Sequence, residues 1–268
     1  MDTTEHLLPT VTIATVTYNA EQTLPRTLES VAAQTYPYVE HLIVDGCSKD
    51  RTMEQIHRYV DANTDKAQAA HVIQVIREPD RGLYDAMNKA LEHATGRYIV
   101  FLNAGDRLHE PDTLQRLFAP LSQMPCGEWP AILYGETDCV DGEGRFLRHR
   151  RLQAPETLDW KDFRWGMLVC HQSFYVRTDL ARQTPYDLAY RFSADYDWCL
   201  RLLEQADRKG LPVRNSHLVL TDYLCEGLTT QNHKASLGER FRIMARHFGW
   251  AATVGRHLWF VLRAVLKK

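Results

Sequence analysis

Carboxylates follow two short apolar runs of this sequence. The run 98–102 is closed by the turn-forming residues Asn103, Gly105 and Asp106, and the run 41–44 ends in Asp45. A short apolar run bounded by turn residues predicts a buried parallel strand. Ligands of open α/β sheets bind at the carboxyl ends of such strands. We therefore expect Asp106 to hold a divalent metal, although aspartate after glycine is also common in ordinary turns.

Polar side chains follow the other predicted strands as well. Thr17 and Asn19 end the run 11–17, and Glu78 and Asp80 follow the run 71–76. Side by side in a parallel sheet, these strand ends would line one edge. The sequence has neither GxGxxG after its first strand nor GxxxxGK[ST], which disfavours a Rossmann dinucleotide site and a P-loop. A nucleotide here would be held by its base, its ribose and a metal-bridged diphosphate.

The segment 79–85 precedes a helical stripe of apolar residues over 83–94. The N-terminus of a helix attracts anions, and Arg81 adds a positive charge that suits a phosphate. The alternative is that Asp80 or Asp85 only caps this helix, and the sequence leaves both interpretations open.

The elements that carry these residues alternate between strand and helix. The predicted strands are 11–17, 41–45, 71–76 and 98–102, with helical spacing between them. Such alternation predicts βαβ units and a parallel sheet. The pattern changes after residue 125, where we expect strands over 131–138, 145–150 and 213–223, a helix over 196–203 and a basic helix over 236–248, with Gly249 and Gly255 bracketing a break.

Composition gives broader limits. The 268 residues carry a formal net charge of -2, so nothing in the overall charge points to nucleic acid. No pair of the six cysteines has CxxC spacing, which argues against a cysteine zinc site. The N-terminal residues lack the basic and apolar regions of a signal peptide. We expect a cytoplasmic protein.

The C-terminal stretch 257–268 is strongly apolar with cationic flanks. Leu258 and Val261 would share one helix face with Leu262 and Val265, and Arg263 would lie opposite. A basic amphipathic helix predicts peripheral contact with the inner face of the cell membrane, here through residues 251–268. Docking of this helix on the protein's own core, or on a second subunit, is the alternative.

Several motifs together resemble the family 2 glycosyltransferases, in the bacterial exopolysaccharide branch of colanic-acid-type enzymes. Their order and spacing make the resemblance specific over residues 11–232. The motifs are 16–19 (Val-Thr-Tyr-Asn), 43–52 (Ile-Val-Asp-Gly-Cys-Ser-Lys-Asp-Arg-Thr), 78–90 (Glu-Pro-Asp-Arg-Gly-Leu-Tyr-Asp-Ala-Met-Asn-Lys-Ala), 101–106 (Phe-Leu-Asn-Ala-Gly-Asp), 171–172 (His-Gln) and 193–197 (Ser-Ala-Asp-Tyr-Asp).

The resemblance implies an α/β GT-A fold: a Rossmann-like, mostly parallel central sheet flanked by helices, with a C-terminal helical tail. Residues 1–230 would form the catalytic domain and 231–268 a helical extension. The implied activity is transfer of a hexosyl or deoxyhexosyl group from a UDP- or GDP-sugar, with inversion and with Mg²⁺ or Mn²⁺ as cofactor. A lipid-linked saccharide in polysaccharide synthesis would be the acceptor.

The same resemblance implies roles for individual residues. Asp195 matches the catalytic base, with Asp197 as the residue most easily confused with it, and Asp106 matches the metal ligand. Asn103 and Gly105 stand where many members carry aspartate. The nucleotide-sugar ligands would be Thr17, Asn19, Asp45, Asp80, Arg81, Gly82, Asp85 and Asn88, and the acceptor contacts His171, Gln172 and Thr229.

Two other functions remain open at this point. A nucleotidyltransferase also binds nucleotides on a doubly wound sheet, but it typically has a glycine-rich loop near the first strand, which residues 18–22 lack. A non-catalytic sugar-nucleotide-binding protein is compatible with the missing aspartates at 103 and 105.

Overall fold

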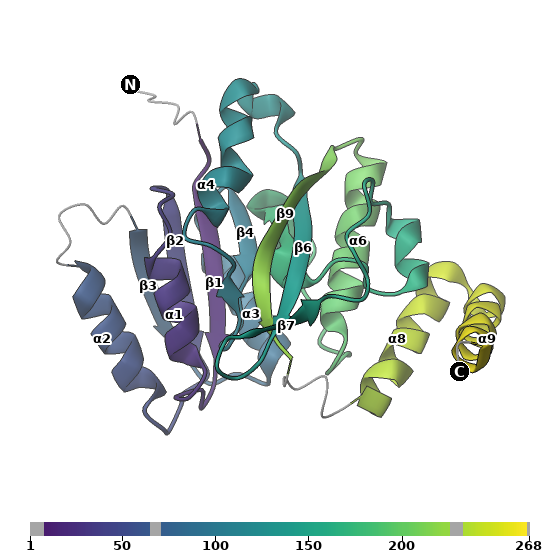
Figure 1. The fold of residues 1–268 in the computed structure, drawn as a ribbon, viewed down its shortest axis with the longest axis horizontal. Coiled ribbons are helices and arrows are strands. Elements are labelled where there is room, and N and C mark those ends of the chain that lie inside the picture. The colour runs from purple at the N-terminus through teal and green to yellow at the C-terminus, as the bar shows by residue number, and fades with distance from the viewer. Residues whose placement is uncertain (1–7, 65–70, 226–232, 267–268) are drawn as a thin grey trace.

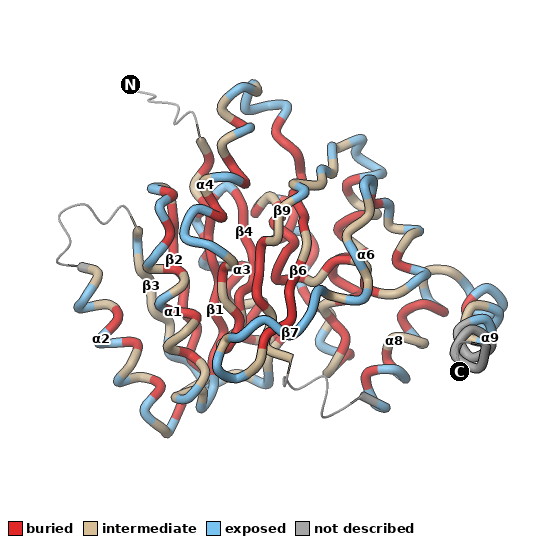
Figure 2. The backbone as a smooth tube through the Cα atoms, in the orientation of Figure 1, coloured by how far each residue is buried: buried red, intermediate tan, exposed pale blue. Residues whose placement is uncertain are grey.

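One mixed sheet runs through the molecule, with helices on both of its faces (Figure 1). The computed structural model describes residues 8–64, 71–225 and 233–266. Its strands follow the order β3-β2-β1-β4-β8-β6-β9-β5, with β7 paired to β6. Buried residues concentrate along the central strands (Figure 2). The predicted α/β architecture is confirmed.

The first four strands are parallel, as their apolar runs predict. In β1 and β2 every residue is buried, which explains their lack of alternation. Thr17 pairs with Asp45 in the register of these strands, so their carboxyl ends meet at one edge of the sheet. The four strands are β1 (Val11–Thr17), β2 (Val39–Asp45), β3 (His71–Arg77) and β4 (Tyr98–Phe101).

Three helices cover the two faces of this parallel half. Ile43 of β2 packs with Leu24 of α1 and Ile56 of α2, whereas its neighbours Leu42 and Val44 belong to the cluster around α3. Alternate residues of a strand point to opposite faces, so α1 and α2 lie opposite α3. The helices are α1 (Leu24–Ala32), α2 (Thr52–Thr64) and α3 (Leu83–His93).

The second half of the sheet is joined to the first by antiparallel pairing of β8 with β4. β8 is also antiparallel to β6, while β9 is parallel to β6 and antiparallel to β5. The strands predicted near 131–138, 145–150 and 213–223 are confirmed. The elements are β5 (Arg107–Leu108), β6 (Ile132–Val140), β7 (Phe146–His149), β8 (Phe174–Arg177) and β9 (Val213–Leu224).

Helix α6 (Ala194–Arg208) extends the helix predicted over 196–203 and buries Trp198 completely. The indole stacks on the ring of Tyr186 with centroids 4.7 Å apart and meets Phe101 of β4 edge-on at 5.6 Å. The other short elements are α4 (Thr113–Phe118), α5 (Thr178–Arg182), and the 3₁₀ turns η1 (Ala119–Gln123), η2 (Cys126–Glu128), η3 (Trp160–Trp165) and η4 (His171–Ser173).

Two further helices, α8 (His233–Phe248) and α9 (Trp250–Leu266), end the described chain. The break at Gly249 is confirmed, because this residue has a φ of 84° between the two helices. The predicted break at Gly255 is wrong, since α9 continues through it. Glycine weakens a helix interior by only about 1 kcal/mol relative to alanine. Within the described ranges, no helix combines the length and apolar character needed to span a bilayer.

Trp198→Ala tests the packing of α6 against the sheet. We expect a loss of about 3–5 kcal/mol in the free energy of unfolding, because the change leaves a large cavity. Trp198→Phe should cost less, since it keeps a ring and removes an indole N–H that finds no acceptor among the described residues. Urea denaturation measures both. Equal losses in the two variants would contradict this account of the packing.

Candidate active site

The turns after β1 and β2 are bound to each other at the predicted edge. Asn19 has a φ of 48°, a conformation that asparagine tolerates. Its backbone N–H donates to the Ser48 hydroxyl at 2.9 Å, and its side-chain oxygen accepts from the Lys49 N–H at 2.9 Å. The Ser48 N–H in turn donates to Asp45 at 2.9 Å, and Arg77 lies 3.6 Å from the same carboxylate oxygen. Asp45 is fully buried, and these contacts hold its carboxylate in place.

Thr17 is the strand-end residue with free bonding capacity. Its hydroxyl is buried and has no hydrogen-bond partner in the part of the chain that the structure describes. The Thr17 carbonyl accepts from the Gly46 N–H at 3.0 Å, which keeps the two strand ends together. A buried hydroxyl without a partner is costly, so it marks a place where a ligand group would be favourable.

The loop before α3 also reaches this edge. A Cβ atom at Gly46 would lie 2.3 Å from an oxygen of Asp80, so only glycine permits their close approach. The other oxygen of Asp80 accepts from the N–H of Gly82, the residue before α3, at 2.9 Å. Arg81 pairs with Asp85 at 2.7 Å, and this hydrogen bond lowers the pKa of Asp85. The Arg81 side chain is otherwise exposed, with room for an anion.

Asn88 has a different environment from its predicted neighbours. Its side-chain nitrogen donates to the Tyr186 carbonyl at 3.0 Å, and its oxygen accepts from the Tyr186 N–H at 2.7 Å. The amide thus joins α3 to the chain before α6. A contact between Asn88 and the donor stays a prediction.

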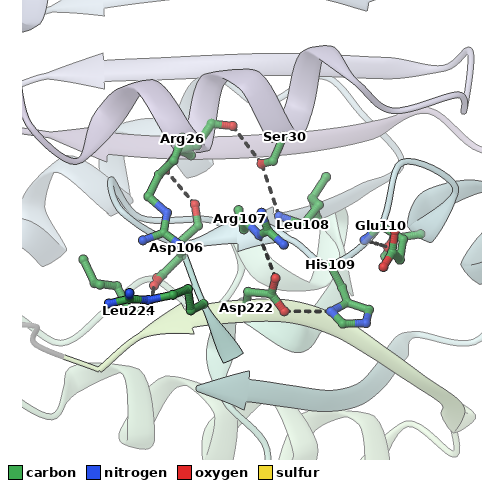
Figure 3. Close-up of polar contacts among 12 residues, drawn as sticks. Arg26, Ser30, Asp106, Arg107, Leu108, His109, Glu110, Asp222 and Leu224 are labelled. Atoms are coloured by element: carbon green, nitrogen blue, oxygen red, sulfur yellow. Dashed lines mark hydrogen bonds and ion pairs between the residues drawn. The ribbon is translucent and has the colours of Figure 1, made fainter. Parts of the chain in front are cut away.

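Asp106 lies in a deeply buried place after β4. Gln172 donates to one of its oxygens at 2.9 Å. The backbone N–H of Leu224, at the end of β9, donates to the other oxygen at 3.0 Å (Figure 3). Burial raises its pKa to about 6, although these two hydrogen bonds and the nearby positive groups oppose the shift. Arg26 of α1 is one of those groups and lies beside Asp106 in Figure 3. No sequence motif pointed to Arg26.

Asn103 supplies a second oxygen suited to a metal. Its side-chain oxygen is buried and accepts no hydrogen bond within residues 8–64, 71–225 and 233–266. Carboxylate and amide oxygens are the ligands that Mg²⁺ and Mn²⁺ prefer. Asp106 and Asn103 therefore fit a divalent cation, even though Asn103 replaces the aspartate of many members of the family.

Asp195 occupies the first turn of α6, and its carboxylate has specific partners. The Tyr84 hydroxyl donates to one oxygen at 3.1 Å, and His171 Nδ1 lies 3.3 Å from the other. Burial alone would raise the pKa of Asp195, but the hydrogen bond and charge of His171 lower it below its usual value. Tyr84 lies inside the 78–90 motif, but sequence reasoning missed it.

Two consecutive residues of η4 connect the two carboxylates. His171 contacts Asp195 through Nδ1, and its Nε2 lies 3.3 Å from the side-chain nitrogen of Asn103. Gln172, the next residue, donates to Asp106. Asp106 and Asp195, which are far apart in the sequence, are thus linked through η4. The pKa of Asp106 is raised and that of Asp195 is lowered. Thr229 lies outside the described residues.

Asp197 has no part in this network. It is fully buried, and its oxygens are bound by Arg201 at 2.6 Å and His247 at 3.1 Å. Arg201 and His247 also line a groove of ≈ 570 Å³ between α6, α8 and the residues that follow α5. Charged groups of that groove are paired with each other, as in His247 with Glu204 at 3.1 Å. We therefore place the chemistry at Asp106 and Asp195.

Comparison with known proteins identifies the family to which this chain belongs. The family described as "Glycosyl transferase family 2" matches residues 12–182. A "PGL/p-HBAD biosynthesis glycosyltransferase" of Mycobacterium bovis is 30% identical over 216 residues, which cover 80% of this chain and 77% of that protein.

Two solved structures share the fold at low sequence identity. TarS of S. aureus in complex with UDP-GlcNAc has a TM-score of 0.64 and 17% identity, and the match covers 88% of this chain and 64% of TarS. The mannosyltransferase PcManGT from Pyrobaculum calidifontis, in complex with GDP-Man and Mn²⁺, has a TM-score of 0.61 and 19% identity, with 93% and 70% covered. The fold is thus GT-A-like, and the family match establishes that the chain is a member of the family 2 glycosyltransferases.

Proposed function

We propose that the protein transfers a sugar, with inversion, from a UDP- or GDP-sugar to a hydroxyl of a lipid-linked saccharide during bacterial exopolysaccharide synthesis. The observation that carries this proposal is the His171–Gln172 bridge between Asp195 and Asp106. It links a candidate base to a candidate metal ligand through two adjacent residues, which supports inverting transfer. The donors in the solved neighbours, UDP-GlcNAc and GDP-Man, support the donor class.

Asp195 is the general base of the proposed reaction. Its lowered pKa keeps it ionised at neutral pH, and Tyr84 and His171 orient both of its oxygens. The acceptor hydroxyl gives its proton to Asp195 while its oxygen forms a bond to the anomeric carbon. The bond from that carbon to the diphosphate breaks on the opposite face, and the nucleoside diphosphate leaves with the electron pair. Attack opposite to the leaving group inverts the anomeric centre.

The donor would lie along the edge formed by the ends of β1, β2 and β4. Thr17, Asn19 and Asp45 are placed for the nucleoside, with the free Thr17 hydroxyl as the most direct contact. Arg81, at the N-terminal end of α3, is placed for the diphosphate. Asp106 and Asn103 would hold Mg²⁺ or Mn²⁺, which neutralises the charge of the diphosphate when bound.

The tail is proposed to bring the enzyme to a membrane-bound acceptor. Helix α9 packs against α8 and η3 along one side, where Arg256 lies 3.6 Å from the centre of the Trp165 ring. Trp250, Val254 and Leu258 recur every four residues and are exposed by 67%, 43% and 67%. An exposed apolar stripe on a basic helix suits insertion at a lipid surface. Packing on the protein's own helices therefore leaves a face for the membrane.

Asp195→Asn should lower the rate constant of transfer by about 10²–10⁴-fold, because an amide cannot accept the acceptor proton. Binding of the UDP- or GDP-sugar with Mn²⁺, measured by calorimetry, should remain near that of the parent. Asp197→Asn is the matched control, since it removes a buried carboxylate of the same helix without changing the base. A parent-like rate in Asp195→Asn would remove this residue from the mechanism.

Asp106 should make stability depend on pH. Its pKa of about 6 in the folded protein exceeds that of an unfolded aspartate, so the folded state binds more protons between pH 4 and 6. Its contribution to stability therefore rises as pH falls from 7 to 4, by about 2 kcal/mol. Comparing urea denaturation of the parent and Asp106→Asn across this range isolates the contribution. A constant difference between the two proteins would show that the carboxylate has an ordinary pKa.

Trp250→Gln with Leu258→Gln tests the membrane face, and both side chains are exposed enough to leave the fold intact. The parent should co-sediment with vesicles rich in anionic lipid, and high salt should weaken this association. The double variant should bind less, as should a chain that lacks residues 251–268. Unchanged co-sedimentation of both would favour docking of α9 on protein alone.

A further inference from the structure

Two buried carboxylates lie side by side on neighbouring strands in the second half of the sheet. Asp138 of β6 and Asp222 of β9 are partners in the parallel register, with exposures of 5% and 3%. The preceding partners, Thr137 and Thr221, point the other way, where Thr221 donates to the Gln172 carbonyl at 2.8 Å. Because strand residues alternate between faces, the two aspartates face away from Gln172.

A histidine completes this cluster. His109 follows β5 and places Nδ1 2.7 Å from Asp222 (Figure 3). One ligand atom each of His109, Asp138 and Asp222 lies within 4.8 Å of the others, the spacing of donors around one ion. Imidazole with two carboxylates suits Zn²⁺, Mn²⁺ or Co²⁺. We propose that these three residues form a second divalent-cation site, separate from Asp106 and from the nucleotide.

The charges around the cluster are consistent with a bound cation. Adjacent buried carboxylates repel each other and need positive charge. Arg107 donates to the second oxygen of Asp222 at 2.7 Å, and His149 lies 2.8 Å from Asp138. With neutral histidines, Asp138, Asp222 and Arg107 sum to one net negative charge, which attracts a cation. Arg107 and His149 then act as outer hydrogen-bond partners that orient the ligating carboxylates.

A cation bound at this site would hold β5 and β9 to β6, close to Asp106. β5 consists of only two residues, and its ladder with β9 pairs Arg107 with Asp222. Asp106 directly precedes Arg107, and Leu224, which donates to Asp106, lies two residues after Asp222. A cation between Asp138 and Asp222 would thus stabilise the strands that fix Asp106.

Titration of the full chain with Co²⁺, without nucleotide, tests the site. We expect one equivalent to bind, with a visible d–d absorption band and a higher melting temperature. His109→Gln should weaken binding at least tenfold. His149→Gln, an exposed residue whose loss should not disturb folding, should weaken it by about 10–100-fold as an outer partner. Asp106→Asn should bind like the parent, which separates this site from the proposed catalytic metal.

His217→Gln is the matched control, because His217 is an exposed histidine near Glu156 rather than in the cluster. It should bind Co²⁺ like the parent. Absence of binding in the parent, parent-like binding in both His109→Gln and His149→Gln, or loss of binding in Asp106→Asn would each overturn the proposal. A thiolate charge-transfer band would also overturn it, by placing the ion on cysteine. None of these readouts depends on transferase activity.

Discussion

The active site depends on one short turn, η4, that touches both carboxylates. His171 and Gln172 are adjacent in the chain and bind Asp195 and Asp106 respectively. The turn is itself attached to the sheet, because the Ser173 hydroxyl is hydrogen-bonded to the Thr137 hydroxyl of β6 at 2.7 Å. A shift of this turn would therefore separate the proposed base from the proposed metal ligand.

Asp106 is buried and Asp195 is half-buried, and their surroundings move their pKa values in opposite directions. Asp195 has an imidazole and a phenol hydroxyl as partners, and the interaction with His171 outweighs desolvation. Asp106 has an amide, a backbone N–H and more distant charges, which do not compensate for burial. Such a split suits separate roles, with one group ready to accept a proton and the other favoured by a cation.

The geometry of the sheet edge depends on several close contacts between residues that are far apart in the sequence. Gly46 leaves room for Asp80, and Asn88 joins α3 to Tyr186, which stacks on Trp198 of α6. The packing that stabilises α6 thus also positions the helix end that carries Asp195. Stability and chemistry share these residues, so the core around Trp198 is part of the support of the site.

Periodicity was enough to predict the parallel half, because β1 and β2 are buried runs whose ends carry their own turn residues. It also placed α6 and the strands near β6, β7 and β9. It did not predict β8, or β5, which has only two residues, and it was wrong at Gly255, where the small cost of glycine does not interrupt α9. The interruption at Gly249 was predictable because a positive φ is a local property.

Local sequence signals predict which residues end the strands and begin the helices, because turn and helix preferences act over a few residues. Which of these residues meet is set by the tertiary fold. It paired His171 with Asp195, gave Asp197 to Arg201 and His247, and set Asp138 beside Asp222. The physical reason is that sheet register and side-chain burial, which set these contacts and the resulting pKa values, are long-range properties with no local signal in the chain.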